Sequence, residues 1–161
     1  MAARFKVFEE KMSRVFFKET MEKLSASWQG AYCRELDDAS WLLVFSQDLT
    51  ASADYCPFTE QLVLFAPVIT LDSQTRNANF LLRLLNANFS WDETKGACFA
   101  IEQDIVALVW RHPLKALEHV ELQDALSSFS ETVSNWKPRL ADVEQTAEMT
   151  ASSVPDNGLI C

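Results

Sequence analysis

The side chains best suited to nucleophilic, redox or metal chemistry are few and far apart in this sequence. It has four cysteines, and no two of them are spaced as a CxxC pair: Cys33, Cys56, Cys98 and Cys161. With only two histidines, His112 and His119, a zinc site would need an unusual set of ligands. We interpret Cys33 and Cys98 as small buried apolar residues. The sequence therefore predicts neither a metal nor a cofactor.

Motifs for catalysis are also missing. The glycines are Gly30, Gly96 and Gly158, which are too dispersed for a phosphate-binding loop, and neither GxSxG nor HExxH occurs. The two histidines are interpreted as surface or capping residues. A pairing of Cys98 with His112 in space, as in a small hydrolase, is the enzymatic alternative. We predict that the protein is not an enzyme.

The charge balance excludes two classes of partner. The chain of 161 residues has 14 basic and 23 acidic residues, a formal net charge of −9 and 48% apolar residues. Binding to nucleic acid or to an anionic membrane depends on lysine and arginine, so neither partner is expected. A basic segment of another protein would be attracted instead. The apolar content is sufficient for one packed domain.

The ends and the apolar runs of the sequence favour a cytoplasmic protein. Charges of both signs follow Met1 every few residues, which is typical of neither a secretory signal nor a transit peptide. The longest uncharged apolar stretch, residues 61–71, contains Pro67 and is too short to span a bilayer. The absence of a signal, together with free thiols, indicates the cytosol.

The first predicted element is an amphipathic helix over residues 4–28 with two adjoining apolar stripes. One stripe contains Phe5, Phe8, Met12, Val15 and Phe16, and the other contains Phe17, Met21, Leu24 and Trp28. Together they form an apolar surface broader than one core contact requires. Either both stripes pack in the core, or one of them faces a partner.

The remaining elements follow from apolar runs and turn residues. Strands are expected at 41–45 and 61–66, with weaker candidates at 31–36 and 53–58, while 47–52 is loop-like. Further on we expect a helix over 75–88, a hairpin of strands 97–102 and 105–110, and a last helix over 120–140. The apolar residues of that last helix recur every three or four positions: Leu122, Leu126, Phe129, Val133, Trp136 and Leu140. This spacing favours a helix that packs one face on a sheet.

These elements predict an α+β fold with the order helix, three strands, helix, two strands, helix. Short connections between strands imply a twisted antiparallel sheet with the helices packed on it. Residues 1–140 would form one domain. Residues 141–161 contain acidic residues but no Lys or Arg, and we expect an acidic, disordered tail there.

The predicted strands are unusual for a sheet that has one solvated face. Residues 41–45, 62–66 and 105–110 are apolar at every position, so both faces of these strands require cover. Three helices cannot cover two sheet faces completely. Each large apolar side chain left in water costs about 1.5–3 kcal/mol. A second copy of the chain, or another protein, is therefore expected to cover part of this surface.

Three segments in the second half of the chain carry a distinctive pattern: LLRLLNANF at 81–89, ACFAIEQDIVALVW at 97–110 and HPLKALEHVELQDAL at 112–126. Together they resemble the Tir-chaperone (CesT-like) family of class I type III secretion chaperones. These segments are similar to the leucine-rich helix ending in an Asn-containing turn, the glycine-led hairpin and the Pro-Leu link of that family. The final helix has the late aromatic and basic residues at Trp136 and Arg139.

The resemblance implies a homodimeric chaperone in the bacterial cytoplasm that supports virulence protein export. Such a protein holds the N-terminal segment of one or more effectors in an extended, export-competent state and can contact the secretion-apparatus ATPase. It implies a dimer interface at Leu81, Leu84, Leu85 and Trp110. Candidate client contacts, assigned by position, are Phe8, Phe16, Trp41, Leu43, Phe45 and Phe65.

Departures from the family pattern, among them a single glycine at Gly96 and His112 in place of a usual leucine, leave the client open. Residues 46–60 are longer than the usual connection, and the acidic tail adds about twenty residues. The alternative within the same fold is a regulatory or adaptor protein that sequesters a secretion-control protein. A plain dimeric adaptor that binds a folded partner is the structural alternative.

Overall fold

The computed structural model describes residues 2–72, 77–114 and 118–151, with side chains described for residues 13–141 of these ranges. The elements in chain order are α1 (Ala2–Ser27), β1 (Tyr32–Asp37), β2 (Ser40–Ser46), β3 (Leu49–Cys56), β4 (Gln61–Thr70), α2 (Ala78–Phe89), β5 (Cys98–Glu102), β6 (Ile105–Pro113) and α3 (His119–Ala151). The α+β fold class predicted from the sequence is confirmed.

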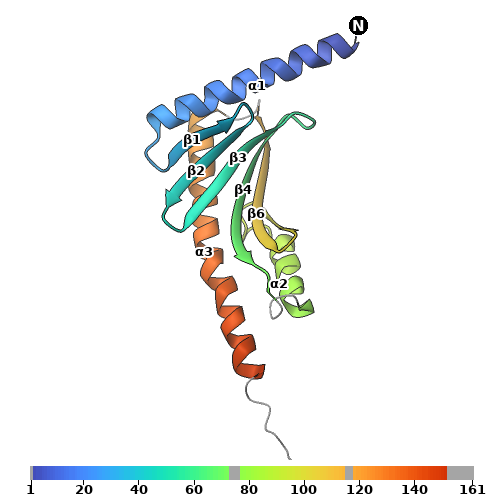
Figure 1. Ribbon diagram of the computed structural model, residues 1–161, viewed down its shortest axis with the longest axis vertical. Helices are drawn as coiled ribbons and strands as arrows, with labels where there is room; N and C mark the ends of the chain where they lie inside the picture. Colours follow the sequence, from blue (N-terminus) through green and yellow to red (C-terminus); the bar gives the residue numbers. More distant parts are fainter. Residues whose placement is uncertain (1, 73–76, 115–117, 152–161) are drawn as a thin grey trace, which may run out of the picture.

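The strands form one antiparallel sheet in the order β1-β2-β3-β4-β6-β5 (Figure 1). β1, β2 and β3 each pair with the next strand in sequence, and β4 then pairs with β6. β5 pairs with β6 as a hairpin and forms the second edge of the sheet. The two edge strands are therefore β1 and β5.

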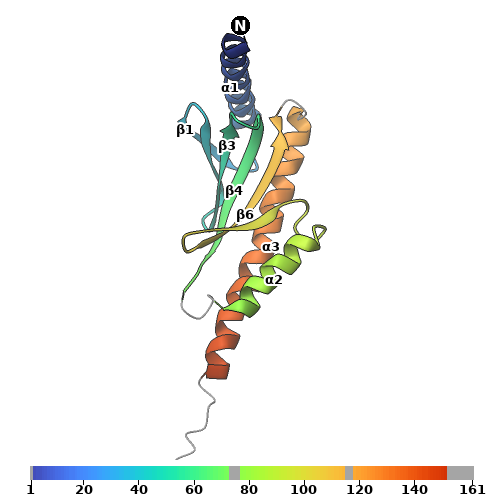
Figure 2. The same ribbon diagram turned by 90° about the vertical axis from the view of Figure 1, so that its right-hand side faces the viewer.

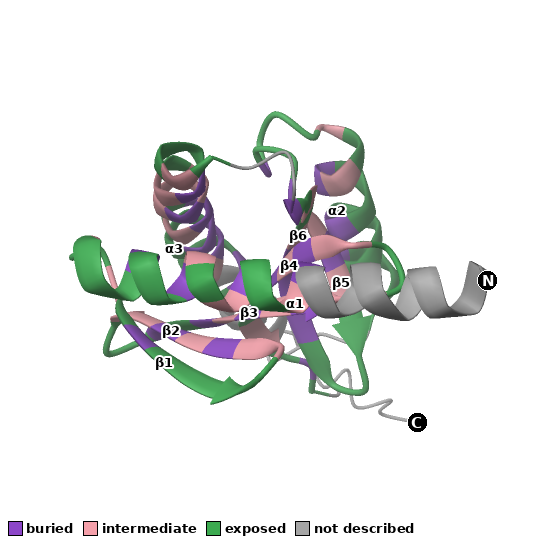
Figure 3. Cartoon of the chain, turned by 90° about the horizontal axis from the view of Figure 1, so that it is seen from above, coloured by how far each residue is buried: buried purple, intermediate pink, exposed green. Residues whose placement is uncertain are grey.

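The core lies between the sheet and the helices. α3 runs along one face of the sheet, α1 crosses one end of it, and α2 lies near the other end (Figures 1 and 2). The apolar positions predicted for the last helix are all buried in this core: Leu122, Leu126, Phe129, Val133, Trp136 and Leu140. Seen from above, α1 lies across the sheet, and the residues coloured as buried are concentrated where helices and strands meet (Figure 3). The sheet is thus covered by helices on one face.

The number of strands before α2 corrects the sequence prediction. Four strands precede α2 instead of three, because β3 combines part of the segment 47–52, which was interpreted as loop-like, with part of the weaker strand candidate at 53–58. β3 contains Leu49, Ala51, Ala53 and Tyr55 on the core face, and small or polar residues alternate with them. Alanine contributes little hydrophobic signal, but its small side chain lets the helices approach the sheet closely.

The end of α3 also differs from the prediction. The helix continues to Ala151 rather than ending at about residue 140, so the first part of the expected tail is helical. Residues 152–161 lie outside the described residues, and the division into a domain and a disordered tail stays a prediction. Within the described residues, no helix is both long enough and apolar enough to cross a bilayer.

Candidate partner-binding surfaces

The face of the sheet opposite α3, called the open sheet face here, is built by the alternate residues of the central strands. Strand register aligns one row of side chains across five strands: Leu42, Ser52, Phe65, Val109 and Cys98. A second row contains Ser40, Asp54, Val63 and Arg111. Because neighbouring strands are about 4.8 Å apart, each row is a continuous surface. Leu42, Val63 and Phe65 are half-buried there.

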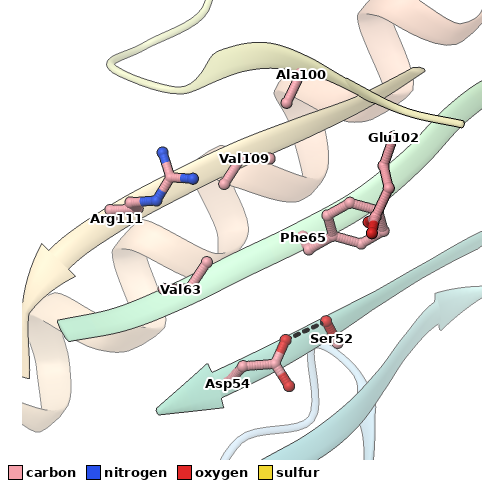
Figure 4. Close-up of a pocket in the computed structure, with 8 residues that line it drawn as sticks. All are labelled: Ser52, Asp54, Val63, Phe65, Ala100, Glu102, Val109 and Arg111. Atoms are coloured by element: carbon pink, nitrogen blue, oxygen red, sulfur yellow. Dashed lines mark hydrogen bonds between the residues drawn. The ribbon is translucent and has the colours of Figure 1, made fainter. Parts of the chain in front are cut away.

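A groove of about 410 Å³ lies on the open sheet face. Its lining comes from four strands: Ser52, Asp54, Val63, Phe65, Ala100, Glu102, Val109 and Arg111. Figure 4 shows these side chains on the side of the sheet that faces away from α3. The groove therefore combines an apolar floor with two carboxylates and one guanidinium group.

The structure separates the client contacts expected on β2 from this open face. Trp41 and Leu43 point toward the helices and are 5% and 0% exposed, so they belong to the core. Phe45 lies on the same side, where its ring meets the Trp28 ring edge-on at a centroid distance of 5.9 Å. Period-two alternation in a strand explains this placement: Leu42 and Val44, between these residues, face the open side.

The remaining expected client residues have different positions. Phe65 lies on the open sheet face, in the groove. Phe16 on α1 is 43% exposed and has the exposed Val15 beside it, whereas Phe17, Met21 and Leu24 of the second stripe are buried. The side chain of Phe8 lies outside the described side chains. Of the two apolar stripes predicted on this helix, the second packs in the core.

The surface of α2 carries an apolar stripe that nothing in the described chain covers. Phe80, Leu84 and Ala87 are buried against the sheet. On the other side, Leu81, Leu82, Leu85 and Phe89 are exposed, and Trp91 lies just beyond the helix. Leu85 is 62% exposed and Phe89 is 88% exposed. A helix with apolar residues on two sides normally contacts something on both of them.

The four residues expected at a dimer interface are split by this arrangement. Leu81 and Leu85 lie on the exposed stripe of α2, but Leu84 is only 3% exposed because it packs on the sheet of its own chain. Trp110 is half-buried against the core, and its ring stacks on the His112 ring at a centroid distance of 5.4 Å. The exposed residues Leu82, Phe89 and Trp91 were missed, although the 3.6-residue period could have placed Leu82 beside Leu85.

Among the described residues, the cysteine and histidine side chains lie apart from one another. Cys98 faces the open side, where the Arg111 Nη1 atom lies 4.0 Å from its Sγ atom. His112 pairs in register with the buried Leu62 and so lies on the other face of the sheet. His119 instead contacts Ser27 through Nε2 at 3.0 Å, which joins the ends of α1 and α3. The Cys98–His112 pair considered as an alternative is therefore not formed.

Two thiols have shifted acidities with different causes. Burial raises the pKa of the Cys33 thiol, because a thiolate would be poorly solvated in the core. The Thr59 side-chain hydrogen bond, followed by the backbone of the same residue, lowers the pKa of the Cys56 thiol. These environments fit an inert apolar role for Cys33, as expected, and a more reactive thiol at Cys56.

The fold is shared with chains in three solved protein complexes. A chain in the HopA1–SchA chaperone–effector complex has a TM-score of 0.64 and 14% identity, with 79% of this chain and 97% of that chain covered. A chain in the ExsC–ExsE complex has a TM-score of 0.63 and 16% identity, with 76% of this chain and 91% of that chain covered. A chain in the structure of the Yersinia pestis type III secretion chaperone SycH with a YscM2 fragment has a TM-score of 0.55 and 13% identity. The match covers 73% of this chain and 96% of that chain. The architecture is that of a secretion-chaperone fold.

The sequence places the chain more specifically. It belongs to the Tir chaperone protein (CesT) family, whose model matches residues 55–137, more than half of the chain. No curated protein sequence matches it. The family predicted from the leucine-rich helix, the hairpin and the last helix is confirmed.

Proposed function

We propose that this protein is a cytoplasmic, bacterial type III secretion chaperone, without catalytic activity, that binds the N-terminal segment of one or more effectors and keeps it extended. Membership of the family supports the chaperone role. The observation that carries the proposal is the sheet covered by helices on one face only, with half-buried Leu42, Val63 and Phe65 on the other. An unfolded segment could cover this apolar area.

The energetic requirement for such a partner fits this surface. Fixing the backbone of an unfolded segment costs about 1–2 kcal/mol per residue. Apolar contact must offset that cost, and interfaces that couple folding to binding bury about 1,000–3,000 Å². The open sheet face and the exposed Val15 and Phe16 of α1 supply apolar surface for that contact. The net charge of −9 would favour basic client segments.

We also propose that the chaperone is a homodimer through the exposed stripe of α2. Leu81, Leu82, Leu85 and Phe89 would meet their counterparts across a two-fold axis, as isologous interfaces require. Leu84 is excluded from this interface because it is already buried. A contact with the secretion-apparatus ATPase, implied by the family resemblance, stays a prediction.

Co-expression followed by purification tests the chaperone role. The protein is expressed in a bacterium that carries a type III system, and the proteins bound to it are identified by mass spectrometry after limited proteolysis. We expect a protected N-terminal segment of an exported protein that has no stable structure on its own. Recovery of only folded, fully protected partners would favour an adaptor instead. Recovery of a secretion-control protein would favour the regulatory alternative.

A further inference from the structure

The groove on the open sheet face has a defined floor and two walls. Val63, Phe65 and Val109 form the apolar floor, and all three come from the central strands β4 and β6. One wall comes from β3 and contains Ser52 and Asp54. Ala100 of β5 pairs in register with Ala107 of β6. Because both side chains are small, they leave room above the floor.

The second wall belongs to the β5–β6 hairpin. In the side view this hairpin bends away from the helices toward the open side of the sheet (Figure 2). It brings Ala100 and Glu102 to the groove, whose lining also includes Phe65 (Figure 4). The two carboxylates, Asp54 and Glu102, therefore stand on opposite walls above a shared apolar floor.

The charged groups of the groove are not neutralised by one another. In the part of the chain that the structure describes, neither Asp54 nor Glu102 forms an ion pair, and Arg111 contacts the Cys98 sulfur instead. The Asp54 carboxylate accepts hydrogen bonds from the hydroxyl groups of Ser40 and Ser52, the second at 2.6 Å. These bonds hold the carboxylate in place but leave its charge uncompensated. The groove thus carries more negative than positive charge.

We propose that this groove binds an extended peptide segment in which apolar side chains alternate with lysine or arginine. In an extended chain, alternate side chains point to opposite sides, so apolar residues can reach the floor formed by Phe65 and its neighbours. The long side chains of lysine or arginine bend back toward the wall carboxylates while their stems cover apolar surface. The proposal rests on the proposed chaperone function and specifies the client chemistry at one site.

Charge complementarity decides between this occupant and a second copy of the chain. A second copy has a net charge of −9, so it would bring like charge to a groove that is already acidic. A basic, apolar segment brings the opposite charge, and its affinity should fall as salt concentration rises. The groove is also separate from the α2 stripe, which is the surface that we assign to the dimer.

Fluorescence anisotropy with two synthetic peptides tests the proposal on the purified full-length protein. One fluorescein-labelled peptide alternates leucine with arginine, and the matched peptide alternates leucine with glutamate. We expect the arginine peptide to bind at least about tenfold more tightly than the glutamate peptide at low salt. Equal affinity for the two peptides would overturn the proposal.

Two variants of the groove distinguish the contribution of its apolar floor to peptide binding from the contribution of its carboxylates. Ala100→Trp should fill the groove and weaken binding of the arginine peptide by about tenfold or more. The double variant Asp54→Asn, Glu102→Gln should remove the preference for arginine while retaining the apolar floor. The matched control is Glu118→Gln, Asp124→Asn, which changes the net charge equally at exposed positions around the start of α3. Loss of the preference in the control as well would contradict a local site.

Repeating the co-purification with these variants distinguishes the two proposals. If the wild-type protein retains a client and both groove variants retain it equally, the groove proposal fails and the chaperone function stands. If no client is recovered but the peptide results hold, the chaperone function fails and the groove stands as a peptide site. If Ala100→Trp changes the sedimentation of the protein alone, the groove belongs to self-association, which overturns the proposal.

Discussion

Asn88 at the end of α2 pairs with both backbone groups of Phe99 in β5. The Asn88 Nδ2 atom donates to the Phe99 carbonyl oxygen at 3.1 Å, and the Phe99 N–H donates to the Asn88 Oδ1 atom at 2.6 Å. A side-chain amide thus replaces the next strand at this edge of the sheet. The pairing fixes α2 against β5. The Phe99 side chain packs on the core side, where its ring contacts the Trp136 ring edge-on at a centroid distance of 4.9 Å.

Replacing Asn88 should therefore destabilise the fold. Asn88→Ala leaves the N–H and the carbonyl of Phe99 without their partner, and a lost pair of this kind costs about 1–3 kcal/mol of unfolding free energy. Urea unfolding at fixed protein concentration, followed by circular dichroism, measures the change. The control is Asn86→Ala on the exposed side of the same helix, for which we expect a change within about 0.5 kcal/mol. Equal effects of the two substitutions would refute the role of Asn88.

The Asn88 pairing shows how far the sequence alone could lead. The Asn-containing turn after the leucine-rich helix was part of the family resemblance, so its presence was predicted. The hydrogen bonds to Phe99 could not be predicted, because they join a side chain of one element to the backbone of another. Likewise, the apolar run of β2 predicted a strand, but the face that Trp41 and Leu43 occupy depends on where the helices lie.

Strand β3 was predicted only weakly and only over its second half, for a different reason. Its pattern of alternating core and surface residues was visible in the sequence, but Ala51 and Ala53 fill two of the core positions. The neighbouring strands bury them: Ala51 lies opposite Leu43 of β2, and Ala53 lies opposite Leu64 of β4. Pairing with the neighbouring strands therefore defines β3 where the local signal is weak.

The α2 stripe predicts the oligomeric state. Leu85→Asp should convert the proposed homodimer to monomers, because each side chain buried in an interface contributes about 1.5–3 kcal/mol and a two-fold symmetric interface contains each residue twice. We expect dimer dissociation to increase by at least about a hundredfold in sedimentation velocity. Val120→Asp, at an exposed apolar residue on α3, is the matched control and should stay dimeric. A dimeric Leu85→Asp protein would place the interface elsewhere.

Thiol alkylation should follow the environments of the cysteines. Because the pKa of Cys56 is lowered by Thr59, a larger fraction of that thiol is ionised at pH 7–8 than for an ordinary cysteine, and it should react early with iodoacetamide. Cys33 should react last, because its pKa is raised and its side chain is buried. Mass spectrometry of timed samples gives the order.

Thr59→Val tests the cause of this reactivity. The substitution removes the hydroxyl group but keeps the backbone of residue 59, so the Cys56 pKa should rise and its alkylation should slow at pH 7–8. The difference from the wild type should shrink as the pH rises above the ordinary thiol pKa of about 8.5, where both thiols are ionised. A rate difference that persists unchanged at high pH would indicate an effect on access instead.

The two edges of the sheet predict where a client strand can be added. At β5 the outward backbone groups of Phe99 are already paired with Asn88. β1 is the other edge, and its exposed Tyr32 and Leu36 offer apolar contact there. A client that extends the sheet should therefore pair with β1, with main-chain hydrogen bonds providing affinity.

Hydrogen exchange on the complex with a co-purified client segment tests this choice of edge. We expect amides within Tyr32–Asp37 to exchange more slowly in the complex than in the free protein, because new backbone hydrogen bonds protect them. Amides of β5 should be unchanged, and buried positions of α3 such as Val133 provide the internal reference. Protection at β5 instead would mean that the client displaces Asn88. If neither edge gains protection while the client stays bound, strand addition is wrong, and side-chain contacts on the open sheet face must hold the client.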